Sequence, residues 1–303
     1  SCPSTAPPSP ARASQPMSTV TPRIPRPTPA ARAPVSFSSA VKKCAVKHSI
    51  PVLQPKNLKN AEFQAELRAL AADLQIVVAF RMLPVAVWDM PSLGTFNLHG
   101  SLLPKYRGAA PINWAVIRGE AETGCTTFFL RHEIDTGDVL LQKRIPVGPN
   151  DTAGDVHDRM MLVGAELVLE TVQLIEGGEY ELQPQDGSLA TPAPKLHREN
   201  CRIDFTQDVQ QVHDFVRGLS PWPAAWTTLD GIQLKLIRTT VEQAHEARPQ
   251  VPGTLLTDNR TYLKIACPGG YLYVHQLQLA GKRRMEIGTF LNGTDIPPAT
   301  VLG

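Results

Sequence analysis

The chain has 303 residues, of which 42% are hydrophobic and 19% are charged, and this composition suits two domains with sizeable cores. No run of eighteen apolar residues occurs, which argues against a membrane-spanning protein. The five cysteines are scattered and form no CxxC pair, so neither a disulfide framework nor a zinc ribbon is indicated. A reduced, cytoplasmic setting fits this cysteine usage best.

The formal net charge of +2 hides an uneven distribution. The first 60 residues contain nine Lys or Arg and no Asp or Glu, which leaves 21 basic and 28 acidic residues, a balance of −7, in the remaining 243. A nucleic-acid-binding protein whose whole surface is basic is therefore excluded. Any nucleic-acid partner would have to be bound by local basic patches.

Residues 1–38 differ in composition from the rest of the chain. They are rich in Pro, Ser, Ala and Arg and contain no acidic residue. Because such a segment cannot bury enough apolar surface to fold, we expect it to be disordered. Its ten prolines within the first 34 residues also argue against the amphipathic helix of a transit peptide.

From about residue 40 the pattern predicts alternating helices and strands, and hence an α/β domain over residues 39–185. The continuous apolar run at 76–80 is typical of a strand buried in a parallel sheet. The predicted elements are a helix capped by Asn60, strands at 76–80 and 95–99, a helix from Pro111 to Gly119, strands near 125–130 and 139–145, and a long helix between Asp151 and Gly177.

A polar segment with two prolines, residues 186–200, is a plausible linker to a second domain over 201–303. This second part contains short β-forming runs near 226–229, 234–237, 261–266 and 272–277, separated by glycine-containing or Asp-Asn turns. Several short strands at roughly ten-residue spacing predict a small β-barrel.

Two polar side chains, Asn97 and His99, are expected on the same side of the strand at 95–99, because successive side chains of a strand alternate between its faces. This strand ends at Gly100, and open α/β sheets usually bind ligands at the carboxyl ends of their strands. The pair therefore predicts a functional site. An ordinary strand end with two hydrogen-bonded polar side chains stays open as the alternative.

The run NLHGSLLPKYRGAAPINWAV, residues 97–116, closely resembles the signature of the 10-formyltetrahydrofolate-dependent formyltransferase family, and HEIDTGD, residues 132–138, resembles the second block of that family. The resemblance extends from about residue 40 to the C-terminus. The motifs GAAPI, DTGD and Pro221-Trp222-Pro223 are most similar to the branch that formylates initiator methionyl-tRNA. We therefore expect a one-carbon transferase of translation initiation.

This resemblance implies a fold and a catalytic set. The fold is a parallel-sheet, Rossmann-like α/β formyltransferase domain followed by an OB-like β-barrel that contacts tRNA. The catalytic residues are Asn97, His99 and Asp135. Formyl transfer creates an oxyanion and releases a proton, so an amide donor and a histidine suit the reaction. Asp135 either orients His99 or holds a water that accepts the proton, and the sequence leaves both roles open.

The resemblance also implies binding residues for 10-formyltetrahydrofolate and tRNA, and no metal. The residues expected at the folate are Ser101, Leu102, Leu103 and Pro104, together with Phe80, Met82 and Leu83. The residues expected at the tRNA are Lys282, Arg283 and Arg284, together with Lys105 and Arg107. A strand-to-helix loop at 80–84 and a solvated basic surface at 282–284 are the structural alternatives. His132 and His157 are interpreted as surface or packing histidines.

The chain departs from the family at its start. Family members begin with a strand of the form RIVFMGTP, whereas the first residues similar to the family here are at about 39–43. We therefore expect residues 1–38 to lie outside the family pattern and the catalytic domain to lack its first strand. Two other functions stay open: a formyltransferase for a sugar-nucleotide amine, and an inactive folate- or RNA-binding remnant. The expected enzyme is a cytoplasmic monomer with no membrane partner.

Overall fold

The computed structural model describes residues 39–79, 81–244 and 250–303, and the chain divides into two compact units, 1–54 and 55–303. In the first unit, helix α1 (Ala40–Lys47) begins after Ser39, whose side-chain oxygen accepts a hydrogen bond from the Lys42 backbone N–H at 3.2 Å. The predicted disorder of 1–38 lies outside the described residues. No helix in the described ranges is long and apolar enough to cross a membrane.

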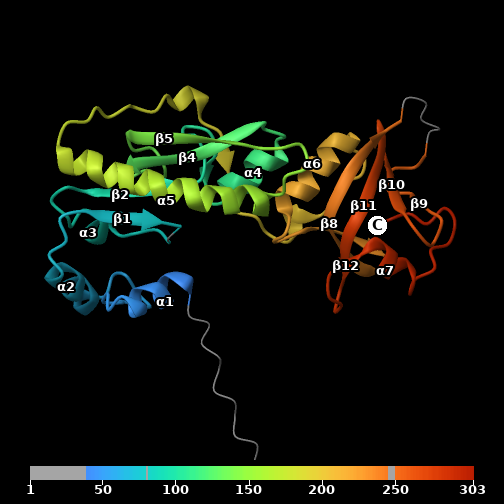
Figure 1. The fold of residues 1–303 in the computed structure, drawn as a ribbon, viewed down its shortest axis with the longest axis horizontal. Helices are drawn as coiled ribbons and strands as arrows, with labels where there is room; N and C mark the ends of the chain where they lie inside the picture. The colour runs from blue at the N-terminus through green and yellow to red at the C-terminus, as the bar shows by residue number, and fades with distance from the viewer. Residues whose placement is uncertain (1–38, 80, 245–249) are drawn as a thin grey trace, which may run out of the picture. The chain divides into compact units, whose positions relative to one another are not determined.

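The second unit begins with an α/β half that carries most of the predicted elements (Figure 1). Its elements in chain order are α2 (Ala61–Ala69), β1 (Gln75–Val78), α3 (Val85–Trp88), β2 (Thr95–His99), β3 (Arg107–Gly108), α4 (Pro111–Ile117), β4 (Glu122–Phe129), β5 (Val139–Pro146) and α5 (Ala153–Gly177). Asn60 caps α2 by accepting a hydrogen bond from the Phe63 N–H at 3.0 Å, which confirms the predicted helix start.

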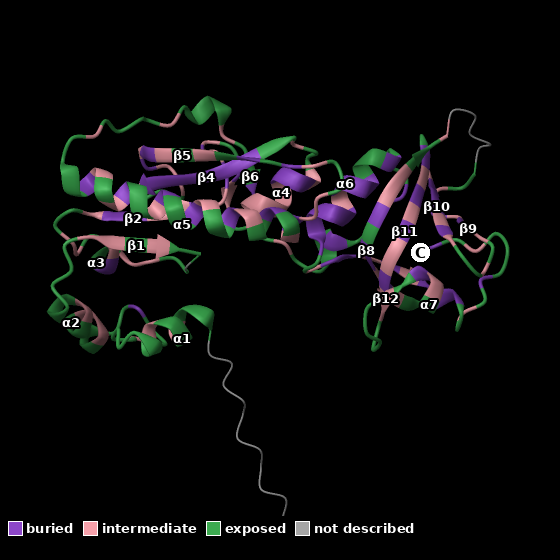
Figure 2. Ribbon diagram, in the orientation of Figure 1, coloured by how far each residue is buried: buried purple, intermediate pink, exposed green. Residues whose placement is uncertain are grey.

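Helix α5 begins at Thr152, which forms a capping box with Asp155, and ends at Gly178 with a φ of 71°. Its buried face packs against the sheet around Cys125 and Ile145. Strand β4 is buried along most of its length, as its purple colour in Figure 2 shows. The end of β2 is therefore held between a buried neighbouring strand and a long helix.

The sheet of this half has the order β1-β2-β4-β5. Strands β1 and β2 pair in parallel, and the pairs β2·β4 and β4·β5 are antiparallel. The prediction that the strand at 76–80 is fully buried is wrong for its described residues, because Ile76 is 42% and Val78 is 54% exposed. Ile76 and Val78 lie on the same face of β1, and neither side chain belongs to a core cluster of the described residues.

A connecting segment follows α5 and contains three short elements, η1 (Gly187–Leu189), β6 (Pro192–Ala193) and η2 (Glu199–Cys201). Strand β6 pairs in parallel with β3, with Arg107 opposite Pro192 and Gly108 opposite Ala193. The segment predicted to be a polar linker is thereby tied to the α/β half through backbone hydrogen bonds.

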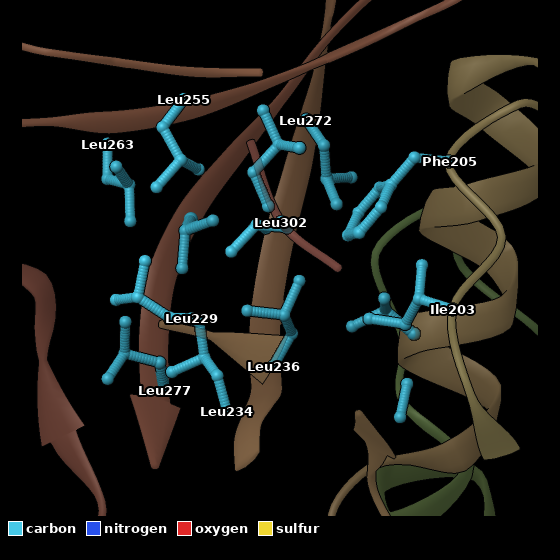
Figure 3. Packing of buried hydrophobic residues seen from close by; sticks show 14 of the residues in the cluster. Ile203, Phe205, Leu229, Leu234, Leu236, Leu255, Leu263, Leu272, Leu277 and Leu302 are labelled. Carbon is cyan, nitrogen blue, oxygen red and sulfur yellow. The ribbon is translucent and has the colours of Figure 1, made fainter. Parts of the chain in front are cut away.

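The C-terminal part packs two helices and several antiparallel strands around its own core, part of which is drawn in Figure 3. Its elements are α6 (Val209–Leu219), β7 (Ala225–Leu229), β8 (Ile232–Gln243), β9 (Leu255–Thr257), β10 (Leu263–Cys267), β11 (Gly270–Leu279), β12 (Met285–Glu286) and α7 (Ile287–Leu291). The strand order in the sheet of this part is β7-β8-β11-β10-β9, and β12 pairs with β11. Backbone bonds join Gly303 to Thr228 of β7, and Leu302 to Gly253 near β9, so the chain end links both edges of this sheet.

Candidate active site at the end of strand β2

A cavity of 1590 Å³ lies in the α/β half, at the carboxyl ends of β1 and β2. The loops after β1, β3 and β4 and one face of α5 contribute to its wall. Its lining includes the side chains of Met82, Leu83, Trp88, Asn97, His99 and Asp135. The predicted catalytic residues thus line one cavity, although Asp135 is far from the other two in the sequence.

His99 is held by a backbone group. Its ring is 6% exposed, and its Nε2 lies 2.8 Å from the carbonyl oxygen of Tyr106. Because a carbonyl only accepts hydrogen bonds, Nε2 carries the hydrogen and donates it. The other nitrogen, Nδ1, lies 3.7 Å from Asp135 Oδ2. The ring therefore presents Nδ1 to the carboxylate, with Phe128 packed edge-on at 6.4 Å between ring centroids.

Asp135 is also held by the main chain. Its backbone has a φ of 55°, and its Oδ2 accepts a hydrogen bond from the Gly108 N–H at 2.9 Å. Gly108 follows Arg107 in the short strand β3, which the sequence did not predict. The carboxylate consequently lies between a fixed N–H donor and His99, in a largely buried position.

Asn97 has an unusual environment for a buried amide. Its Oδ1 is buried and has no protein hydrogen-bond partner. A buried polar atom without a partner costs about 1–3 kcal/mol, so such atoms are uncommon in structural positions. Among the buried side-chain nitrogen and oxygen atoms of the described residues, only Thr123 Oγ1 and Arg159 Nε share this feature. The amide therefore has hydrogen-bonding capacity that the protein itself does not use.

The residues predicted at the folate fall into two groups. Met82 and Leu83 line the cavity, and Phe80 lies outside the described residues. The four residues Ser101, Leu102, Leu103 and Pro104 do not line it. Ser101 is fully buried and its hydroxyl donates to the Lys105 carbonyl at 2.6 Å, while Leu103 packs against Phe128 and Val139. These side chains are used to fold the turn after β2.

The predicted basic residues do not gather at one place. Lys105 pairs with Glu120 at 3.3 Å, and the Arg107 guanidinium donates to Gln185 Oε1 from Nε at 3.1 Å and from Nη2 at 2.7 Å. Lys282, Arg283 and Arg284 are exposed in the turn between β11 and β12. Arg284 donates a hydrogen bond to the Pro221 carbonyl at 2.7 Å.

Sequence reasoning missed the residues that hold the predicted catalytic side chains, among them Tyr106 and Gly108. Tyr106 acts through its carbonyl oxygen and Gly108 through its N–H, so neither has a side-chain pattern that could have revealed it. The two histidines interpreted as surface or packing residues, His132 and His157, are exposed and both border the cavity. In the described ranges, no group of three or more His, Cys, Asp or Glu could hold a metal ion.

Comparison with known proteins decides the family. Residues 19–172 match the model described as formyl transferase, and residues 195–295 match the model of the formyl transferase C-terminal domain. The chain belongs to the formyltransferase family. The first match begins inside residues 1–38, so the domain boundary drawn at residue 38 stays a prediction.

Several relatives of this formyltransferase are similar over most of their length. A methionyl-tRNA formyltransferase of Parabacteroides distasonis is 54% identical over 264 residues, which cover 84% of this chain and 81% of the relative. The methionyl-tRNA formyltransferase of Bacteroides fragilis is 50% identical over 281 residues, covering 89% and 86%. That of Flavobacterium johnsoniae is 46% identical, covering 88% and 85%.

Solved structures with the same fold are more distant in sequence. HypX from Aquifex aeolicus in complex with tetrahydrofolic acid is 23% identical with a TM-score of 0.60, and the match covers 79% of this chain but only 43% of HypX. An N-formyltransferase from Helicobacter canadensis, in complex with folinic acid and dTDP-3-aminofucose, is 20% identical with a TM-score of 0.61, covering 82% and 84%. These likenesses establish the formyltransferase fold.

Proposed function

We propose that this chain transfers the formyl group of 10-formyltetrahydrofolate to the α-amino group of initiator methionyl-tRNA. The observation that carries the proposal is that Asn97, His99 and Asp135 all line the same cavity, with His99 and Asp135 3.7 Å apart. The choice of acceptor rests on relatives that are about half identical over most of this chain and bear that activity in their names.

The cavity fits a folate in its chemistry. Met82, Leu83 and Trp88 offer apolar surface for flat rings, and Asn97 offers an amide with an unpartnered buried oxygen. When bound, the folate supplies an activated formyl group at an amide nitrogen. The unpartnered Oδ1 of Asn97 can then accept a hydrogen bond from an N–H of a substrate, which removes the cost of its burial.

Asn97 and His99 stabilise the charge that develops on the formyl oxygen. Attack by the neutral amine converts the planar carbon to a tetrahedral one and places negative charge on this oxygen. The Asn97 amide donates an N–H, an interaction that typically contributes about 3–4 kcal/mol to such a transition state. Because Nε2 of His99 donates to Tyr106, only Nδ1 is available to exchange a proton or donate to the substrate.

Asp135 controls the charge around Nδ1. Its Oδ2 lies 3.7 Å from Nδ1 and accepts the Gly108 N–H, so the carboxylate stays in one orientation relative to the ring. In the protonated imidazole, Nδ1 also carries a hydrogen, and the carboxylate stabilises this positive charge. We assign Asp135 the orienting role. His99 takes the proton from the attacking amine, which becomes the formamide, and passes it to N10 of the folate as the bond between the formyl carbon and N10 breaks and tetrahydrofolate leaves.

The tRNA is the larger substrate and needs a second contact. Exposed Lys282 and Arg283 in the C-terminal part suit phosphate oxygens, which any tRNA offers independently of sequence.

The four described cysteines are unpaired, in keeping with a cytoplasmic enzyme. We assign the enzyme a monomeric state, because all three proposed catalytic side chains come from one chain.

The test is transfer of radiolabelled formyl from 10-formyltetrahydrofolate to methionyl-tRNA by the full chain. His99→Ala should reduce the rate by about 10²–10⁴-fold. The matched control is His197→Ala, because His197 is exposed and does not line the cavity. Absence of labelled tRNA with the unchanged protein, or labelling that survives His99→Ala, contradicts the proposal.

A further inference from the structure

The segment after α5 contributes one side chain that reaches the proposed catalytic group. Gln185 lies two residues before η1 and is half-buried, whereas Gln183 in the same segment is exposed. The Gln185 Nε2 donates to the carbonyl oxygen of Asp135 at 3.0 Å and to that of Gly137 at 2.7 Å. Its Oε1 accepts both hydrogen bonds from the Arg107 guanidinium.

The chemistry of these partners fixes the orientation of the Gln185 amide. A guanidinium only donates and a carbonyl oxygen only accepts, so the amide oxygen must face Arg107 and the amide nitrogen must face the loop. All four hydrogen bonds are satisfied in this one orientation. The side chain is therefore a fixed bridge between two loops that are separate in the sequence.

The bridge closes a ring of interactions around Asp135. Arg107 is followed by Gly108, whose N–H donates a hydrogen bond to the Asp135 carboxylate. The backbone carbonyl of Asp135 in turn accepts a hydrogen bond from Gln185, which closes the ring. The ring therefore holds Asp135 at its side chain and at its main chain. Asp135 itself has a φ of 55°, a left-handed conformation that a non-glycine residue keeps only when its surroundings stabilise it.

We propose that Gln185 is a positioning residue that holds Asp135 beside His99, and that it affects formyl transfer only through Asp135. This inference rests on the proposed function for its kinetic consequence. A displacement of about 1 Å at a catalytic group can cost roughly 100-fold in rate. Gln185 does not line the cavity, so substrate binding should depend little on it.

The first experiment compares three variants with the unchanged protein. Gln185→Met keeps the length of the side chain and removes all four hydrogen bonds. Gln185→Glu keeps an acceptor for Arg107 but places a carboxylate against the two carbonyl oxygens. Gln183→Met is the matched control, because the Gln183 side chain is exposed. We expect both Gln185 variants to lower kcat by roughly 10- to 100-fold with little change in KM, and the control to match the unchanged protein.

A double-mutant cycle with Asp135→Asn separates positioning from a general loss of structure. If Gln185 acts through Asp135, Gln185→Met lowers kcat in the normal background and causes no further loss beside Asp135→Asn. Equal losses in both backgrounds would assign Gln185 a merely structural role and overturn the proposal. Unchanged kcat in Gln185→Met would overturn it as well.

Amide hydrogen exchange of the loop that contains Asp135 tests whether Gln185 positions this loop, without any measurement of activity. Peptides that cover 131–138 should exchange faster in Gln185→Met, and at the normal rate in Gln183→Met. Unchanged exchange in the Gln185 variant contradicts the bridge. If the unchanged protein fails to formylate methionyl-tRNA, the proposed function fails, while this exchange comparison still accepts or rejects the positioning of the loop by Gln185.

Discussion

The carbonyl oxygen of Tyr106 lies 2.8 Å from His99 Nε2, and this contact determines which ring nitrogen faces Asp135. Tyr106 is itself fixed, because its hydroxyl donates to Glu120 at 2.7 Å and its N–H donates to the Thr191 hydroxyl at 2.9 Å. Burial also raises the pKa of Tyr106, so its hydroxyl stays a donor throughout the neutral range. A chain of fixed groups thus leaves Nδ1 as the ring nitrogen to which we assign the proposed proton transfer.

Asn97 should matter for activity and not for stability. Asn97→Leu keeps the approximate shape of the side chain but removes an amide whose oxygen is buried without a partner. We expect kcat to fall by about 10²–10³-fold while the free energy of unfolding stays equal or rises by about 1 kcal/mol. Formyl-transfer kinetics and urea unfolding measure the two effects. A large loss of stability would instead make Asn97 a structural residue.

Gly108 should tolerate no side chain. Its φ is 126°, and a Cβ at this position would lie 2.6 Å from the Ala193 carbonyl oxygen. Gly108→Ala should therefore lower the free energy of unfolding by about 1–3 kcal/mol and reduce kcat, because the N–H that holds Asp135 moves. Gly187→Ala is the control, since a Cβ there meets no atom within 4 Å. Equal Tm values for the two variants would contradict this prediction.

A buried histidine in the C-terminal part should make stability depend on pH. Burial lowers the pKa of His213 below its ordinary value, and the neighbouring charge of Arg217 acts in the same direction. Opposing contributions come from the Pro149 carbonyl, which accepts from Nε2 at 3.2 Å, and from Asp214. Nδ1 is bonded to the Thr239 hydroxyl at 3.0 Å.

The unfolded chain therefore binds this proton more readily than the folded chain. The stability contribution of neutral His213 is complete above the ordinary histidine pKa of about 6.5 and is lost as the pH falls below it. His213→Gln should show a smaller fall in unfolding free energy between about pH 7.5 and about pH 5.5 than the unchanged protein. Parallel curves for the two proteins would show that His213 does not contribute.

The exposed basic turn should contribute to tRNA binding by charge alone. Lys282→Ala and Arg283→Ala should each weaken binding of methionyl-tRNA, and each should reduce the slope of log Kd against log salt by about one. Arg284 is less suited to this role because it donates to the Pro221 carbonyl. Arg260→Ala, at another exposed position, is the control. Unchanged salt slopes would remove this turn from the proposed interface.

Local patterns were enough to predict much of the fold. Asn60 and Thr152 cap their helices where the sequence indicated, and the strand Thr95–His99 has the predicted bounds. Asn97 and His99 both line the cavity, in keeping with the period of two. These features depend on neighbours a few residues away, so the sequence contains their physical cause directly.

Other features depended on which segments meet in space. The sequence indicated a buried strand at 76–80, but the exposure of Ile76 and Val78 depends on what packs against their face of β1. The side chain of Ser101 turns inward to the Lys105 carbonyl instead of lining the cavity. In the first case the tertiary environment overrode a local pattern, and in the second it differs from what the family resemblance implied.

The sequence by itself determined the family motifs, most helix and strand positions of the α/β half and the three candidate catalytic residues. Only the tertiary structure decided how those residues are held: Tyr106 fixes His99, and Gly108 and Gln185 fix Asp135. The physical reason is that two of these contacts are made by backbone groups, which every residue has, and the third spans 50 residues of sequence. No local pattern encodes such contacts, because they form only when the fold brings the segments together.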